Sequence, residues 1–243
     1  MRAYITPYVW LPTIKAEFDF TIPNAGGSGQ TATLTAVPSG YGPKLASTGM
    51  LSASVYKGNW GALTDIIYMN LTDVKSDVTS ITGPGGAVTI PVNTNVQARL
   101  TSTIWTLGAT YNLLPNTPPE NFSAVLGFRY TRMSPSASWN FSGPLGLLPI
   151  SGSHSENVTL WDGIVGAKGQ FNFTDGHWYA PYYFDIGTGG AQLTYQAVGG
   201  VGYGFRHGAW SLVYRYLYYN QGNGKLLHYL NLDGPALAYT FRL

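Results

Sequence analysis

The chain has 243 residues, a formal net charge of +2, no cysteine and only 10% charged residues. The absence of cysteine excludes disulfide frameworks, zinc ribbons and thiol catalysis. The near-neutral charge balance excludes a basic nucleic-acid-binding surface, so no nucleic-acid partner is expected. Hydrophobic residues make up 44% of the chain, which excludes a disordered protein.

Alternation of side-chain type predicts ten strands and no long helix. In chain order the strands cover residues 3–18, 46–57, 60–73, 97–112, 121–133, 157–173, 177–187, 192–206, 209–220 and 226–243. Three connections are long and rich in Gly, Ser, Thr and Pro, namely 19–45, 74–96 and 134–156. Because 19–45 or 74–96 could hide a hairpin, eight or twelve strands remain possible. No linker divides the chain, so residues 1–243 are expected to form one domain.

The two faces of the predicted strands differ in an unusual way. In 121–131 and 209–219, aromatic residues bracket an apolar centre on one face, and a single Arg lies in the middle of the other face. Strands of a soluble sandwich alternate too, but their outward face carries the charges. Here the apolar face runs the length of the strand and charge is sparse, which predicts strands that face lipid.

Aromatic residues recur at a fixed spacing along the apolar faces. Trp60 and Tyr68, Phe122 and Tyr130, and Trp210 and Tyr218 are each eight residues apart. For a strand tilted by about 40°, eight residues rise roughly 20 Å, close to the roughly 25 Å apolar band of an outer-membrane barrel. We therefore predict an aromatic girdle made of Trp60, Tyr68, Phe122, Tyr130, Trp161, Phe171, Trp178, Phe184, Trp210 and Tyr218.

A Gly-x-Trp pattern occurs at Gly58, Gly176 and Gly208, each between two predicted strands. Glycine suits the positive φ of a tight hairpin, and the following Trp suits a membrane interface. Short turns therefore alternate with the long connections, as in barrels with short periplasmic turns and longer extracellular loops.

Several segments together resemble the small outer-membrane β-barrels of Gram-negative bacteria, of the porin-like or OmpA-like kind. These segments are Pro7–Trp10, Trp60–Tyr68, Gly127–Tyr130, Trp161–Lys168, Tyr214–Leu217 and Gly234–Arg242. The resemblance implies a single antiparallel transmembrane barrel in the bacterial outer membrane, in contact with membrane lipid and lipopolysaccharide. It also implies recognition by the barrel-assembly machinery through a signal in the last strand, formed by Tyr239, Phe241 and Leu243.

With the aromatic face outward, six charged residues point into the barrel: Asp65, Arg129, Asp162, Lys168, Asp185 and Arg215. All six are expected near mid-height. One hypothesis is a constricted pore whose selectivity these residues set. The alternative is an ion-paired plug, because the interior of a small barrel is commonly filled by side chains.

Other possible functions have weaker support in the sequence. The run Gly199–Gly204 lacks the helix of a nucleotide site, and we expect its inward glycines to make room for bulky neighbours. A Ser-His-Glu hydrolase would need Ser155 within reach of His154, but in a strand Ser155 faces away from His154 and Glu156. A protease site at the extracellular rim would draw on Asp73, Asp77, His154, Glu156 and His228, whose arrangement cannot be read from the sequence. No metal site or cofactor is expected, because the histidines lack ligand spacing.

We therefore expect a non-enzymatic barrel that serves envelope structure, with at most narrow passive permeation of small solutes. Four alternatives remain open: a selective small-solute channel, a protein that binds a partner through the long loops, an outer-membrane hydrolase, and a soluble lipid-binding calyx. The apolar stretch 145–150 is the strongest candidate for a partner contact in the loops.

Overall fold

The computed structural model describes residues 1–20, 30–36, 48–75, 81–82, 89–90, 95–114, 118, 121–140, 151–155, 157–173, 176–222 and 227–243. Every regular element in this part of the chain is a β-strand. The described residues contain no helix that is long and apolar enough to cross a membrane.

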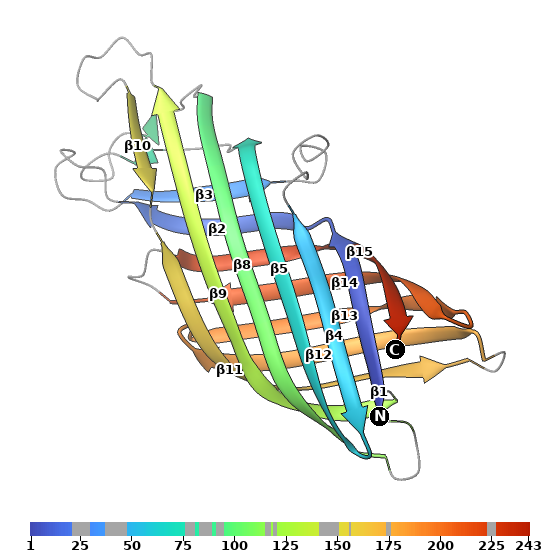
Figure 1. Ribbon diagram of the computed structural model, residues 1–243. Helices are drawn as coiled ribbons and strands as arrows, with labels where there is room; N and C mark the ends of the chain where they lie inside the picture. Colours follow the sequence, from blue (N-terminus) through green and yellow to red (C-terminus); the bar gives the residue numbers. More distant parts are fainter. Residues whose placement is uncertain are drawn as a thin grey trace.

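Ten strands, counted over the described ranges, form a closed antiparallel ring (Figure 1). The last strand of the chain pairs with the first, which closes the ring and confirms the predicted ten-stranded all-β barrel. In ring order the strands are β1 (Arg2–Trp10), β4 (Gly49–Lys57), β5 (Trp60–Lys75), β8 (Asn95–Asn112), β9 (Phe122–Asn140), β11 (Val158–Asn172), β12 (Trp178–Gly189), β13 (Leu193–Gly204), β14 (Gly208–Asn220) and β15 (Leu227–Arg242).

The first predicted strand, 3–18, is interrupted at Leu11 and Pro12. Proline has no N–H to donate to a sheet, and the Leu11 carbonyl comes so close to Gly234 that a Cβ there would lie 2.1 Å from it. The chain resumes as β2 (Thr13–Phe20), which stays beside β15 and pairs on its other side with β3 (Gln30–Ala36). A hairpin is therefore present within 19–45, and it lies outside the ring.

The other two long connections also contain strand structure. Within 74–96, β6 (Ile81–Thr82) pairs with β7 (Thr89–Ile90). Strand β9 continues beyond the predicted end at residue 133 and pairs with β10 (Ser151–Ser155) inside 134–156. The hairpin that the sequence left possible within 74–96 is therefore present. The expectation of a plain loop was wrong for 134–140 and 151–155, because Ser- and Thr-rich segments can add polar strand length beyond an apolar band.

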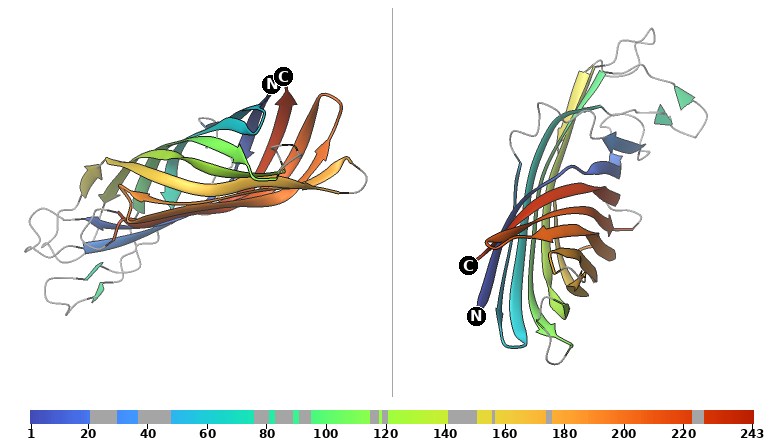
Figure 2. Two further views of the ribbon diagram at one scale, coloured as in Figure 1. Left: turned by 90° about the horizontal axis from the view of Figure 1, so that it is seen from below. Right: turned by 90° about the vertical axis from the view of Figure 1, so that its right-hand side faces the viewer.

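Two of the three Gly-x-Trp patterns form the predicted turns. Gly58 and Gly176 have φ values of 61° and 71°, in the left-handed region that glycine adopts without strain. Gly208 differs, because it is the first residue of β14 and lies in extended structure after the turn. These turns lie at the same end of the barrel as both chain termini (Figures 1 and 2).

The outer face of the ring is apolar. Leu126 is 70% exposed, Trp60 63% and Val165 56%, and each lies on the outward side of its strand. Large exposed apolar patches on a protein mark contact with lipid or another protein. In a soluble lipid-binding calyx the exposed outer face is polar and an apolar face lines the cavity. Here an apolar face points outward, which does not fit a calyx.

Candidate functional site

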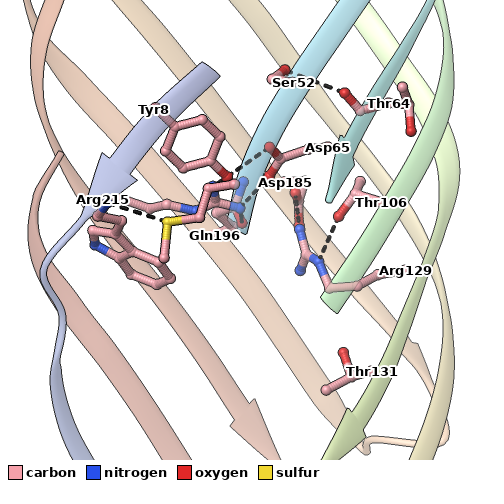
Figure 3. Close-up of polar contacts among 12 residues, drawn as sticks. Tyr8, Ser52, Thr64, Asp65, Thr106, Arg129, Thr131, Asp185, Gln196 and Arg215 are labelled. Carbon is pink, nitrogen blue, oxygen red and sulfur yellow. Dashed lines mark hydrogen bonds and ion pairs between the residues drawn. The ribbon is translucent and has the colours of Figure 1, made fainter. Parts of the chain in front are cut away.

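All six predicted interior charges lie on inward-facing positions of the ring, but they form separate groups. Arg215 with Asp65 makes one group, and Arg129 with Asp185 and Asp162 makes a second. Lys168 lies elsewhere, nearer the turns. The first two groups form a polar layer across the middle of the barrel (Figure 3).

The Arg215 group joins four ring strands. Its guanidinium donates to the Asp65 carboxylate at 2.6 Å, to the Tyr8 hydroxyl at 2.8 Å and to the Gln196 amide oxygen at 2.7 Å. The Tyr8 hydroxyl in turn donates to Asp65 at 2.7 Å. The guanidinium also lies 5.0 Å from the centre of the Trp10 ring, a cation–π arrangement.

The Arg129 group is fully buried. Arg129 forms an ion pair with Asp185, and it also donates to the hydroxyls of Thr106 at 3.3 Å and Thr194 at 3.2 Å. Asp162 lies directly opposite Arg129 on the neighbouring strand. One oxygen of Asp162 accepts the backbone N–H of Ala191 at 2.7 Å, so this carboxylate also anchors the turn between β12 and β13.

These contacts cross the lumen. Strands β5 and β14 are not adjacent in the ring, and neither are β9 and β13, yet Arg215 reaches Asp65 and Arg129 reaches Thr194. A third bridge joins Thr131 on β9 to Tyr219 on β14, with 2.7 Å between the hydroxyls. Strands that are not neighbours in the ring face each other across the lumen. Side-chain contacts between such strands therefore occupy the barrel interior.

The barrel interior on the far side of the polar layer from the turns is apolar. Buried side chains from most ring strands pack there into one cluster: Trp10, Ile14, Met50, Ile67, Met69, Leu100, Ile104, Met133, Val158, Leu160, Ala191, Leu217, Tyr219, Leu230, Leu232 and Ala236. This cluster was not predicted from the sequence, because only the charged residues and the glycines of the inward face were considered. The cluster could have been predicted from the inward-facing apolar residues that lie between each mid-strand charge and the strand end away from the turns.

Lys168 was expected at mid-height, and the structure corrects this. It lies six residues along β11 from Asp162, toward the turns. Lys168 is therefore still on the inward face of the strand, but outside the polar layer. Its ammonium lies 5.5 Å from the centre of the Tyr56 ring, which belongs to β4 across the lumen. Both residues line a polar cavity of about 630 Å³ at the turn end of the barrel, here called the vestibule.

The predicted girdle residues all lie on outward-facing positions. Trp60 and Trp210 pack edge-on against Tyr111 and Tyr239, at ring-centre distances of 4.8 and 4.9 Å. Trp161 packs against both Phe128 and Tyr130. The outer face of the barrel also carries Tyr68, Phe122, Phe171, Trp178, Phe184 and Tyr218. Their depth in a membrane stays a prediction.

Of the predicted assembly-signal residues, Tyr239 and Phe241 face outward with their rings 4.7 Å apart, and Leu243 follows β15. Recognition of these residues by an assembly machinery stays a prediction.

Several predicted features lie outside the described residues. They include the apolar stretch 145–150, most of the long connections, and the side chains of Asp73, Asp77, His154 and Glu156. Within the described part, no group of His, Asp and Glu side chains is arranged to hold a metal ion.

Of the inward glycines in 199–204, Gly202 makes room for a bulky neighbour, as predicted, whereas a Cβ on Gly204 would make only ordinary contacts. Gly202 lies opposite Tyr179, and a Cβ on Gly202 would meet the Tyr179 ring at 2.2 Å. The segment is part of an extended strand, β13, and no helix follows it.

Comparisons with known proteins find similarity among solved structures. Neither a family model nor a curated protein sequence matches the chain. Among solved structures, the chain is similar to the translocator domain of the autotransporter NalP from Neisseria meningitidis, with a TM-score of 0.36 and 12% identity over 99% of this chain and 88% of that one. It is also similar to the P. putida toluene transporter TodX, with a TM-score of 0.30 and 10% identity over 100% of this chain and 90% of the other. The barrel assignment itself rests on the strand pairing described above.

Proposed function

We propose that the protein is an integral β-barrel of the Gram-negative outer membrane with a closed lumen, and that its role is non-enzymatic and structural. The observation that carries this proposal is the pair of side-chain groups that cross the lumen, centred on Arg215 and Arg129. On the side away from the turns, the packed apolar cluster occupies the interior. Ten strands enclose little more room than eight, and the interior of an eight-stranded barrel is filled by side chains.

The outer face supports the membrane location. A ring of exposed apolar and aromatic side chains surrounds the barrel, and water would not solvate such a surface favourably. Strands in a closed ring satisfy all their backbone hydrogen bonds with one another, which is the condition for crossing a bilayer without helices. We propose membrane lipid, lipopolysaccharide and the barrel-assembly machinery as the partners of this surface.

The interior supports a structural role over a catalytic one. The carboxylates of Asp65, Asp185 and Asp162 are each engaged by a buried guanidinium or a backbone N–H. A catalytic acid or nucleophile must reach a substrate, whereas these groups are enclosed by their own partners.

Planar-bilayer conductance of the refolded protein tests the closed lumen. We expect no single-channel steps from protein whose folding is established by a heat-dependent shift in gel mobility. Reproducible steps, with an ion selectivity that Arg129→Ala changes, would contradict the closed lumen and favour the selective channel. A known porin reconstituted in the same lipid is the control for insertion.

A further inference from the structure

The vestibule has the size and the boundaries of a small-molecule site. Its volume of about 630 Å³ falls within the range of about 300–1,000 Å³ usual for ligand pockets. Thr6 and Ser52 line it, and Ser52 lies opposite Asp65 in the ladder between β4 and β5, so this part of the cavity is next to the Arg215 group. The other end opens beside the turns, next to His177 and Arg242. The vestibule therefore lies between the Arg215 group and the turns.

The charged side chains on its described wall all carry the same sign. Arg2, Lys168 and Arg242 line the cavity from three different strands. No Asp or Glu side chain belongs to the described lining, while Glu120 and Asp175 lie outside the described residues. The ion pairs among described residues join Arg129 to Asp185 and Arg215 to Asp65, so no described carboxylate neutralises Lys168 or Arg242. A pocket lined by one sign of charge concentrates its field and attracts the opposite sign.

Two glycines keep this pocket open. Tyr56 and Tyr179 line it, and a Cβ on Gly61 or Gly202 would lie 2.5 or 2.2 Å from their rings. Each ring therefore lies flat against the wall, in the space that a larger residue would occupy. The tyrosine hydroxyls, with those of Ser54 and Ser211, add hydrogen-bonding groups around the cations.

We propose that the vestibule binds a small organic anion that carries carboxylate or phosphate groups. Lys168 and Arg242 would donate charge-assisted hydrogen bonds to its anionic groups, and the hydroxyl-rich wall would contact its uncharged polar groups. The ligand enters from the turn end and does not pass the Arg215 group.

Calorimetric titration of the folded, detergent-solubilised protein tests this site, with citrate as the carboxylate probe and inorganic phosphate as the phosphate probe. We expect saturable binding of at least one probe, and the preferred probe assigns the anion class. Lys168→Gln and Arg242→Gln should each weaken the affinity by about tenfold, the effect of one lost charge-assisted hydrogen bond. Lys15→Gln and Arg132→Gln are matched controls, because both remove one exposed cation outside the cavity and should leave the affinity unchanged.

Three results would overturn the proposal. They are no binding of either anion, equal loss of affinity in all four variants, and equal binding of the neutral polyol sorbitol. Gel mobility establishes that each variant is folded, and Arg242→Gln, at the exposed end of β15, is the second test if Lys168→Gln does not fold.

Discussion

At the scale of single residues, the barrel interior shows why buried charges occur in groups. An isolated ion in a dry interior loses its hydration, and partners must replace the lost hydrogen bonds. Arg129 has Asp185, Thr106 and Thr194 around it, and all four side chains are buried. Asp185 and Thr194 come from strands that are not neighbours of β9 in the ring, so these contacts also fix how the strands are arranged around it.

Removing one member of the buried Arg129 ion pair should be costly. We expect Arg129→Met to lower the free energy of unfolding by about 3–5 kcal/mol, because Asp185 is left as an unpaired buried charge. The double variant Arg129→Met with Asp185→Leu should recover at least half of that loss, since it removes both charges. Arg132→Met, an exposed arginine on the same strand, should change the value by at most about 0.5 kcal/mol.

Urea titration of the protein in lipid vesicles, followed by tryptophan fluorescence, measures these differences. A loss of less than about 1 kcal/mol for Arg129→Met, below the 3–5 kcal/mol range, would show that the ion pair contributes little to the closed barrel.

At the scale of elements, the sequence predicted the ring strands well and the contacts between them poorly. Alternation determines which side of a strand each residue occupies, so every predicted interior charge faces inward. It carries no information on which strands meet across the lumen, because that depends on closure of the ring and on register. Tyr8 and Gln196, both partners of Arg215, were missed for this reason. The hairpin β2–β3 was hidden because it continues past the band of alternating residues.

The close approach of two neighbouring strands, β13 and β14, allows a prediction about their glycines. A Cβ on Gly200 would lie 2.2 Å from the Leu212 carbonyl oxygen and 2.6 Å from the Val213 Cα, whereas Gly199, next to it on the outer face, has open space. We expect Gly200→Ala to destabilise the barrel by about 1–3 kcal/mol through overpacking against backbone. Gly199→Ala should stay within about 0.5 kcal/mol of the parent.

The same urea titration compares the two glycine variants. Equal stability of both would show that strands β13 and β14 separate easily, which contradicts the tight ladder between them.

At the scale of the whole molecule, the interior changes character along the barrel axis. The vestibule at the turn end is polar and open, the middle is crossed by ion-paired groups, and the remainder is packed with apolar side chains. Two different kinds of barrier thus lie in series, so loss of the polar groups alone would leave the apolar packing as a seal.

This arrangement predicts which interior positions solvent reaches, and the cysteine-free chain allows the test by single substitutions. Ser54 lines the vestibule, Ser102 is only 2% exposed beside the apolar cluster, and Ser155 is exposed at the opposite end from the turns.

With a membrane-impermeant maleimide, Ser155→Cys should react in intact cells, because the long connections face outward in the proposed orientation. Ser54→Cys should react only after the outer membrane is permeabilised, and Ser102→Cys only after unfolding in urea. Reaction of Ser102→Cys in the folded protein would contradict the sealed interior, and reaction of Ser54→Cys in intact cells would reverse the orientation.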